Sequence, residues 1–169
     1  MELEKIQEKI RNTLGEVESI LDVGCGSGAL VEFLAEHVAQ EALGIDIRSD
    51  DFHEKVRSSK DGTYHSAGCV KGDVHSMHSF PDERFDAVVT VHAFHELSNP
   101  ETALSEIRRV LKLGGTLLIA DFAKGETRWN ERYYTPEEVE AMLKRGGFTQ
   151  IDVEKVSGVP FLFAIGKKQ

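Results

Sequence analysis

The sequence ILDVGCGSG at residues 20–28 decides the fold, together with ALGID at residues 42–46. An apolar run enters a glycine-rich turn, a helical segment follows, and a second apolar run ends on Asp46. This order is typical of an open α/β sheet that holds a nucleotide-type cofactor. Glycines let the backbone pass close to the ligand, and an acid at the tip of the second strand can accept hydrogen bonds from ribose hydroxyls.

Composition and charge narrow the class of protein. The chain has 169 residues, 40% of them hydrophobic and 29% charged, which predicts one soluble globular domain over residues 1–169. A formal charge of −9 argues against binding to nucleic acid or anionic membrane. No apolar stretch approaches the roughly 20 residues of a membrane span. The only cysteines are Cys25, inside the glycine turn, and Cys69, so a cytoplasmic protein without a disulfide is expected.

The spacing of apolar residues predicts the order of helices and strands. Helices are expected at residues 2–14, 29–38, 50–59, 100–111 and 135–146. Strands are expected at residues 19–23, 42–46, 64–71, 85–91 and 116–120, and at residues 150–156 and 161–165. Alternation through the first five strands predicts a mostly parallel sheet, and the last two indicate an antiparallel pair. The sequence sets no oligomeric state.

The glycine spacing and the acids that follow it indicate which kind of nucleotide-type cofactor to expect. Dinucleotide-binding folds use Gly-x-Gly-x-x-Gly, whereas residues 24–28 read Gly-x-Gly-x-Gly. Asp46 follows Gly28 by 18 residues, a suitable reach for a ribose. Residues 72–74, Gly-Asp-Val, follow the third strand, where a carboxylate can accept a hydrogen bond from an adenine amine. The fourth strand ends at residues 91–95, at the sheet edge where such folds bind ligands.

With these motifs in order, the chain resembles the class I S-adenosylmethionine-dependent methyltransferases, in particular the small-molecule branch with the ubiquinone and menaquinone enzymes. The matching segments are residues 21–28, Asp46, and residues 72–74, 85–89 and 109–117. The family more often has proline where Leu113 stands. The resemblance implies an α/β, Rossmann-like three-layer sandwich with a mostly parallel seven-stranded sheet and an antiparallel last strand.

The resemblance also implies a cofactor site for S-adenosylmethionine and its product S-adenosylhomocysteine. The glycine turn would line the amino-acid end, Asp46 the ribose, and Asp73 with Val74 the adenine. Asp22 would brace the turn or reach the cofactor amine through water. The full expected set is Asp22, Gly24, Cys25, Gly26, Gly28, Asp46, Ile47, Gly72, Asp73, Val74 and His92.

Methyl transfer from a sulfonium needs alignment more than charge stabilisation, and alignment can supply roughly 7–11 kcal/mol. A phenol or thiol acceptor also needs a base, for which His92 and His95 are the candidates. Both histidines, like Asp121, could instead serve only local hydrogen bonding.

The acceptor itself is expected to be a small, largely apolar or aromatic molecule. Residues 122–136 have no clean period and are expected to form a lid, in which Phe122, Trp129, Tyr133 and Tyr134 either cover the acceptor or only pack.

Several classes of chemistry lack their signatures. The Asn/Asp-Pro-Pro-aromatic motif of nucleic-acid amino-methylating enzymes does not follow the fourth strand. No metal is expected, because His65, Cys69, His75 and His78 match no standard zinc spacing. Two alternatives remain open. One is a methyltransferase-like subunit that binds cofactor without catalysis or depends on a partner. The other, less favoured, is an NAD-dependent oxidoreductase.

Overall fold

The computed structural model describes residues 2–169. The eight strands in this range form a single mixed sheet, with helices between them. The helical elements are α1 (Glu2–Leu14), α2 (Ala29–His37), the 3-10 turn η1 (Phe94–Glu96), α3 (Pro100–Val110) and α4 (Pro136–Arg145). The strands are β1 (Val17–Val23), β2 (Ala39–Asp46), β3 (Phe52–Arg57), β4 (Tyr64–Lys71), β5 (Phe85–Val91), β6 (Leu111–Phe122), β7 (Thr149–Lys155) and β8 (Phe161–Lys167).

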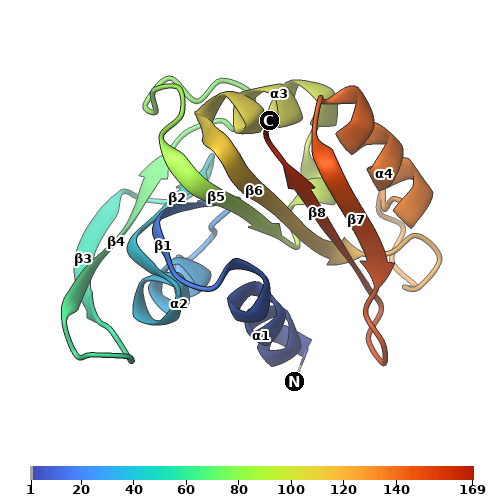
Figure 1. Ribbon diagram of the computed structural model, residues 1–169. Helices are drawn as coiled ribbons and strands as arrows, with labels where there is room; N and C mark the ends of the chain where they lie inside the picture. Colours follow the sequence, from blue (N-terminus) through green and yellow to red (C-terminus); the bar gives the residue numbers. More distant parts are fainter. Residues whose placement is uncertain (1) are drawn as a thin grey trace.

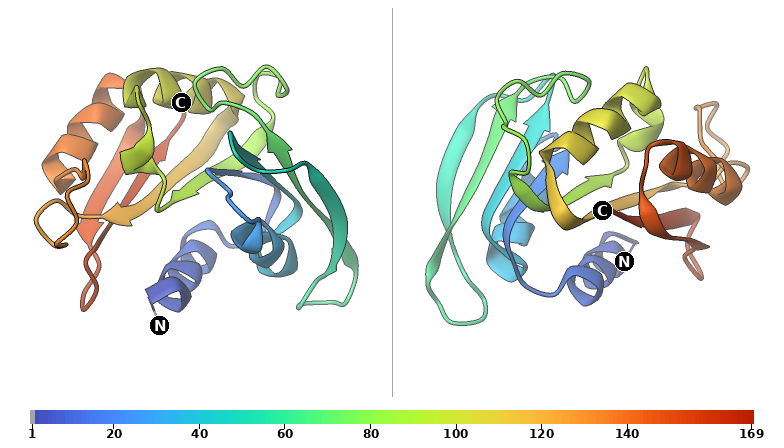
Figure 2. Two further views of the ribbon diagram at one scale, coloured as in Figure 1. Left: turned by 180° about the vertical axis from the view of Figure 1, so that it is seen from behind. Right: turned by 45° about the horizontal axis from the view of Figure 1, so that its top comes forward.

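The strand order is β3-β4-β2-β1-β5-β6-β8-β7. β4, β2, β1, β5 and β6 pair in parallel, and β8 is antiparallel to both β6 and β7. The helices form one layer on each face, α1 and α2 on one side and α3 and α4 on the other (Figures 1 and 2). The α/β three-layer sandwich with a mostly parallel sheet and an antiparallel last strand is therefore confirmed.

Alternate residues of the central strands supply two hydrophobic cores. In β1, Leu21 packs into the core with α3 and α4, whereas Ile20 packs into the core with α1 and α2. Each central strand is buried on both faces, which explains its near-continuous apolar run. The two cores fix the sheet rigidly, so the loops at its carboxyl edge are held by a stable frame.

The predicted helix at residues 50–59 is wrong, and so is the count of seven strands. This segment contains β3, an edge strand antiparallel to β4. Phe52 and Val56 are half-buried against the α2 side, and the residues between them are exposed. Apolar residues four apart lie on one face of a helix and equally on one face of a strand. The free edge of β4 decides for the strand, because pairing there satisfies its backbone groups.

Candidate functional site at the carboxyl edge of the sheet

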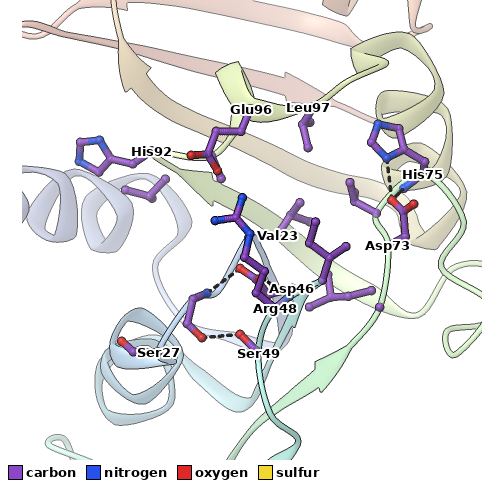
Figure 3. Close-up of a pocket in the computed structure, with 18 of the residues that line it drawn as sticks. Val23, Ser27, Asp46, Arg48, Ser49, Asp73, His75, His92, Glu96 and Leu97 are labelled. Atoms are coloured by element: carbon purple, nitrogen blue, oxygen red, sulfur yellow. Dashed lines mark hydrogen bonds and ion pairs between the residues drawn. The ribbon is translucent and has the colours of Figure 1, made fainter. Parts of the chain in front are cut away.

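The carboxyl ends of β1, β2, β4 and β5 surround a cavity of about 860 Å³, within the size range of small-molecule sites. Figure 3 shows the side chains around it. Of the predicted cofactor residues, Gly24, Gly26, Asp46, Ile47, Gly72, Asp73, Val74 and His92 line this cavity. The parallel topology therefore brings together residues up to 68 positions apart in the sequence.

The turn after β1 requires glycine at two positions, which have different neighbours. Gly24 has φ +81°, and a Cβ there would lie 2.5 Å from the Ala93 Cβ. Gly28 has φ +87°, and a Cβ there would lie 2.5 Å from the Phe52 ring. Gly24 lines the cavity, whereas Gly28 makes room for the Phe52 ring of β3. Gly28 does not line the cavity.

Asp46 connects the end of β2 to the glycine turn. One of its carboxylate oxygens accepts a hydrogen bond from the Gly26 N–H at 3.0 Å, and the other accepts from the Arg48 N–H at 2.8 Å. The Ser49 hydroxyl donates to the Gly26 carbonyl and holds the same turn from the other side. Asp46 is therefore fixed in orientation at the cavity wall.

Asp73 is oriented by His75. The backbone N–H of His75 donates to the Asp73 carboxylate at 2.9 Å, and its Nδ1 lies 2.6 Å from the same oxygen. These hydrogen bonds hold the pKa of Asp73 below its usual value. His75 Nε2 in turn accepts from the Asn99 N–H at 3.2 Å. Because Nε2 accepts, the ring proton of neutral His75 lies on Nδ1 and is donated to Asp73, which is held as an anion.

Asp22 and Cys25 lie behind the turn rather than in the cavity. Asp22 is 2% exposed, and burial, followed by the charge of Asp46, raises its pKa to about 7. Cys25 is also buried, and its side chain packs with that of Cys69 against Gly44. Burial raises the pKa of the Cys25 thiol, so a reactive thiolate is not formed there.

His92 borders the cavity, but its ring turns away from the cavity centre (Figure 3). The ring lies 4.9 Å from that of Phe122 and 4.7 Å from that of Phe161. Burial lowers the pKa of His92, so the imidazole is neutral at neutral pH. Its φ of +59° is unusual outside glycine and shows that the chain turns sharply after β5.

His95 and Asp121 form a buried pair at the end of β6. The His95 Nδ1 lies 2.9 Å from both carboxylate oxygens of Asp121, and the His95 N–H donates to the carboxylate at 2.8 Å. The Phe122 N–H donates to it as well, at 2.8 Å. Because the Asp121 carboxylate accepts, the ring proton of neutral His95 lies on Nδ1, and Nε2 keeps the free lone pair. Neither residue lines the cavity.

An aromatic cluster adjoins the cavity at His92. Phe122 contacts Trp129, Tyr133 and Phe161, with ring centroids 5.0, 5.6 and 4.6 Å away, and Tyr133 also packs on His95. Tyr134 instead packs on Phe94. The predicted acceptor residues Phe122, Trp129 and Tyr133 are thus brought together, and Tyr134 is separate from them.

The cavity wall also contains residues outside the predicted set of cofactor residues. They are Val23, Ser27, Ile45, Arg48, Ser49, Asp50, Phe52, His75, Val91, Ala93, Glu96, Leu97 and Ser98. Most lie within a quoted motif or follow directly on one, so taking each motif whole and extending it by a turn would have included them. Phe52 could not be found in this way, because its position depends on β3.

Within residues 2–169, no group of three or more His, Cys, Asp or Glu side chains is placed to hold a metal ion. None of the helices in that range could cross a membrane.

The fold and the cavity define a class: an α/β domain with a cavity at the carboxyl edge of its sheet, where open α/β folds bind ligands. The family described as "Methyltransferase domain" matches residues 21–119, and the chain belongs to it.

Three individual proteins illustrate the similarity. "O-methyltransferase cnsE" of Penicillium expansum is 28% identical over 161 residues, covering 87% of this chain and 58% of that protein. "Demethylmenaquinone methyltransferase" of Thermotoga maritima is 32% identical over 114 residues, 66% of this chain and 46% of that protein. The solved structure of "[4+2]-Cyclase SpnF" superposes with a TM-score of 0.75 at 20% identity, covering 97% and 80%. The chain thus spans less than two thirds of these two curated relatives.

Proposed function

We propose that this protein transfers a methyl group from S-adenosylmethionine to a small molecule. The observation that carries this proposal is the acidic lining of the cavity. Its wall contains four carboxylates, those of Asp46, Asp50, Asp73 and Glu96, and Arg48 is its only Lys or Arg side chain. A cofactor with a sulfonium and an ammonium group suits such a wall. The diphosphate of a dinucleotide would be repelled by it, which disfavours the NAD-dependent alternative.

The residues present fit this cofactor along its whole length. The backbone of Gly24 and Gly26 would face its amino-acid end, and Asp46, already oriented, would accept from the ribose hydroxyls. Asp73, held as an anion by His75, would accept from the adenine amine beside Val74. Asp22 would support the turn from behind, with Gly28 and Cys25 in packing roles.

The bound cofactor would supply a methyl group activated by its positive sulfur. The protein's task is to align the two partners and exclude water. Where the acceptor carries a hydroxyl, its proton must move to a base. His95 is better prepared for this than His92, because Asp121 orients its ring and leaves Nε2 basic.

The acceptor we infer is small and largely apolar or aromatic. The support is the cluster of Phe122, Trp129 and Tyr133, which lies in the segment we propose as a lid. The relatives described as O-methyltransferase and demethylmenaquinone methyltransferase agree with such an acceptor, and the second agrees with the quinone branch. Two free thiols, Cys25 and Cys69, suit a reducing compartment such as the cytoplasm.

A cofactor-binding subunit without catalysis of its own is the second candidate. The observation in its favour is that a protein described as a [4+2]-cyclase shares the fold, so methyl transfer does not follow from the fold.

An assay for S-adenosylhomocysteine separates the two candidates. The protein is incubated with labelled S-adenosylmethionine and pools of phenols, quinols, amines and thiols, with Asp46→Ala as the control. We expect acceptor-dependent product that is lost in the variant. Saturable cofactor binding without product from any pool would favour the non-catalytic subunit.

A further inference from the structure

Glu96 is the one acid of the cavity wall that combines a central position with a free carboxylate. It follows β5 on η1, and Figure 3 shows its side chain directed into the cavity. The side chain makes no hydrogen bond or ion pair with any of residues 2–169. Asp46 and Asp73, by contrast, are engaged by backbone N–H groups. Glu96 is therefore available to a ligand.

Its position relative to the bound cofactor follows from the proposed function, on which this inference rests. The sulfur joins the amino-acid part, at Gly24 and Gly26, to the ribose, at Asp46. Glu96, on the segment after β5, lies across the cavity from Asp46 (Figure 3).

Glu96 also lies toward the acceptor side. It directly follows His95 in the chain, and the ring of His95 lies 4.8 Å from that of Tyr133 in the aromatic cluster. Glu96 thus stands between the cofactor cavity and the proposed lid, where the methyl group would be transferred.

We propose that Glu96 recognises the positive charge on sulfur and so distinguishes S-adenosylmethionine from its product. The sulfonium is a cation, and the thioether that remains after transfer is neutral. A nearby carboxylate attracts the first and has no net charge to attract in the second. Arg48 extends from the β2 side and forms no ion pair with Glu96. Glu96 therefore favours binding of the substrate form and release of the product form.

The test compares dissociation constants by calorimetry in wild type and Glu96→Gln. The ligands are S-adenosylmethionine, S-adenosylhomocysteine and an analogue with an ammonium group in place of the methylsulfonium. We expect Glu96→Gln to weaken the two cationic ligands about fivefold, with the affinity for S-adenosylhomocysteine unchanged within twofold. Raising the salt concentration should reduce this difference, because the carboxylate is exposed.

Glu8→Gln is the matched control, because Glu8 is an exposed acid on α1, outside the cavity. It removes the same charge from another place and should leave the ratio of the two affinities within twofold of wild type. An equal loss for charged and neutral ligands in Glu96→Gln would overturn the inference, as would an equal shift of the ratio in Glu8→Gln. Failure of the wild type to bind any of the three ligands would overturn the proposed function itself.

Discussion

Buried Asp22 is the residue whose ionisation links the glycine turn to stability. Its pKa of about 7 lies above the value of about 3.9 in an unfolded chain. Between these values the folded protein binds more protons than the unfolded chain. The contribution of Asp22 to the free energy of unfolding therefore falls as pH rises from about 4 to about 7 and is level above that.

Asp22→Asn should remove this dependence. We expect the stability of the variant, relative to wild type, to increase by roughly 2–3 kcal/mol between pH 5 and pH 8. Urea unfolding of both proteins at the two pH values measures the difference. A difference that is the same at both pH values would show that Asp22 ionises normally.

Asp121 is the second buried acid at this edge, and it accepts from His95 and Phe122. Replacing it by asparagine puts an amide N–H₂ where only acceptors are needed. Asp121→Asn should lower the free energy of unfolding by about 2–4 kcal/mol. Asp152→Asn, an exposed change on β7, should stay within about 0.5 kcal/mol. Similar values for both variants would contradict a structural role for the His95–Asp121 pair.

At the scale of elements, the motifs at strand ends could be predicted, and their neighbours in space could not. Residues 20–28 and Asp46 specify a turn and an acid because the chemistry is local in sequence. β3 was not predicted, because the spacing of Phe52 and Val56 fits a helix and a strand alike. The segment is a strand because it pairs with the edge of β4. The inward direction of Glu96 depends on η1, which no local pattern in the sequence signals.

β2 passes directly under the glycine turn, and Gly44 makes this approach possible. A Cβ there would lie 2.4 Å from the Cys25 Cβ and 2.8 Å from the Cys69 sulfur. Gly44→Ala should therefore cost about 1–3 kcal/mol of stability through overpacking.

A double-mutant cycle with Cys69→Ala checks this mechanism by unfolding measurements. Removing the Cys69 sulfur makes room on one side, so the double variant should recover part of the loss. Purely additive effects would mean that Gly44 and Cys69 do not interact.

At the scale of the whole molecule, the site is assembled by topology. Parallel pairing brings the turn after β1, Asp46, Asp73 and the segment after β5 to one sheet edge, and β6 adds the aromatic cluster beside it. The acidic character of the cavity appears only after this assembly, because its four carboxylates come from three separate segments of the sequence. The net charge of −9 gives no sign of where they gather.

Trp129 reports on the segment 122–136, since it is the only tryptophan and is 61% exposed. If this segment closes on ligand, its environment becomes less polar. Saturating S-adenosylhomocysteine should shift its fluorescence emission to shorter wavelength, and Trp129→Phe should abolish the signal. Unchanged emission under conditions where calorimetry shows saturation would argue against a lid.

The central claim is that this cavity holds a cationic adenosine cofactor, and a calorimetric titration tests it most directly. Purified protein is titrated with S-adenosylmethionine, and NAD is titrated in parallel. The account predicts micromolar binding of S-adenosylmethionine alone, reduced at least tenfold in Asp46→Ala, because that variant loses the carboxylate at the end of β2. Binding of NAD in its place, or equal binding of S-adenosylmethionine by the variant, would contradict it.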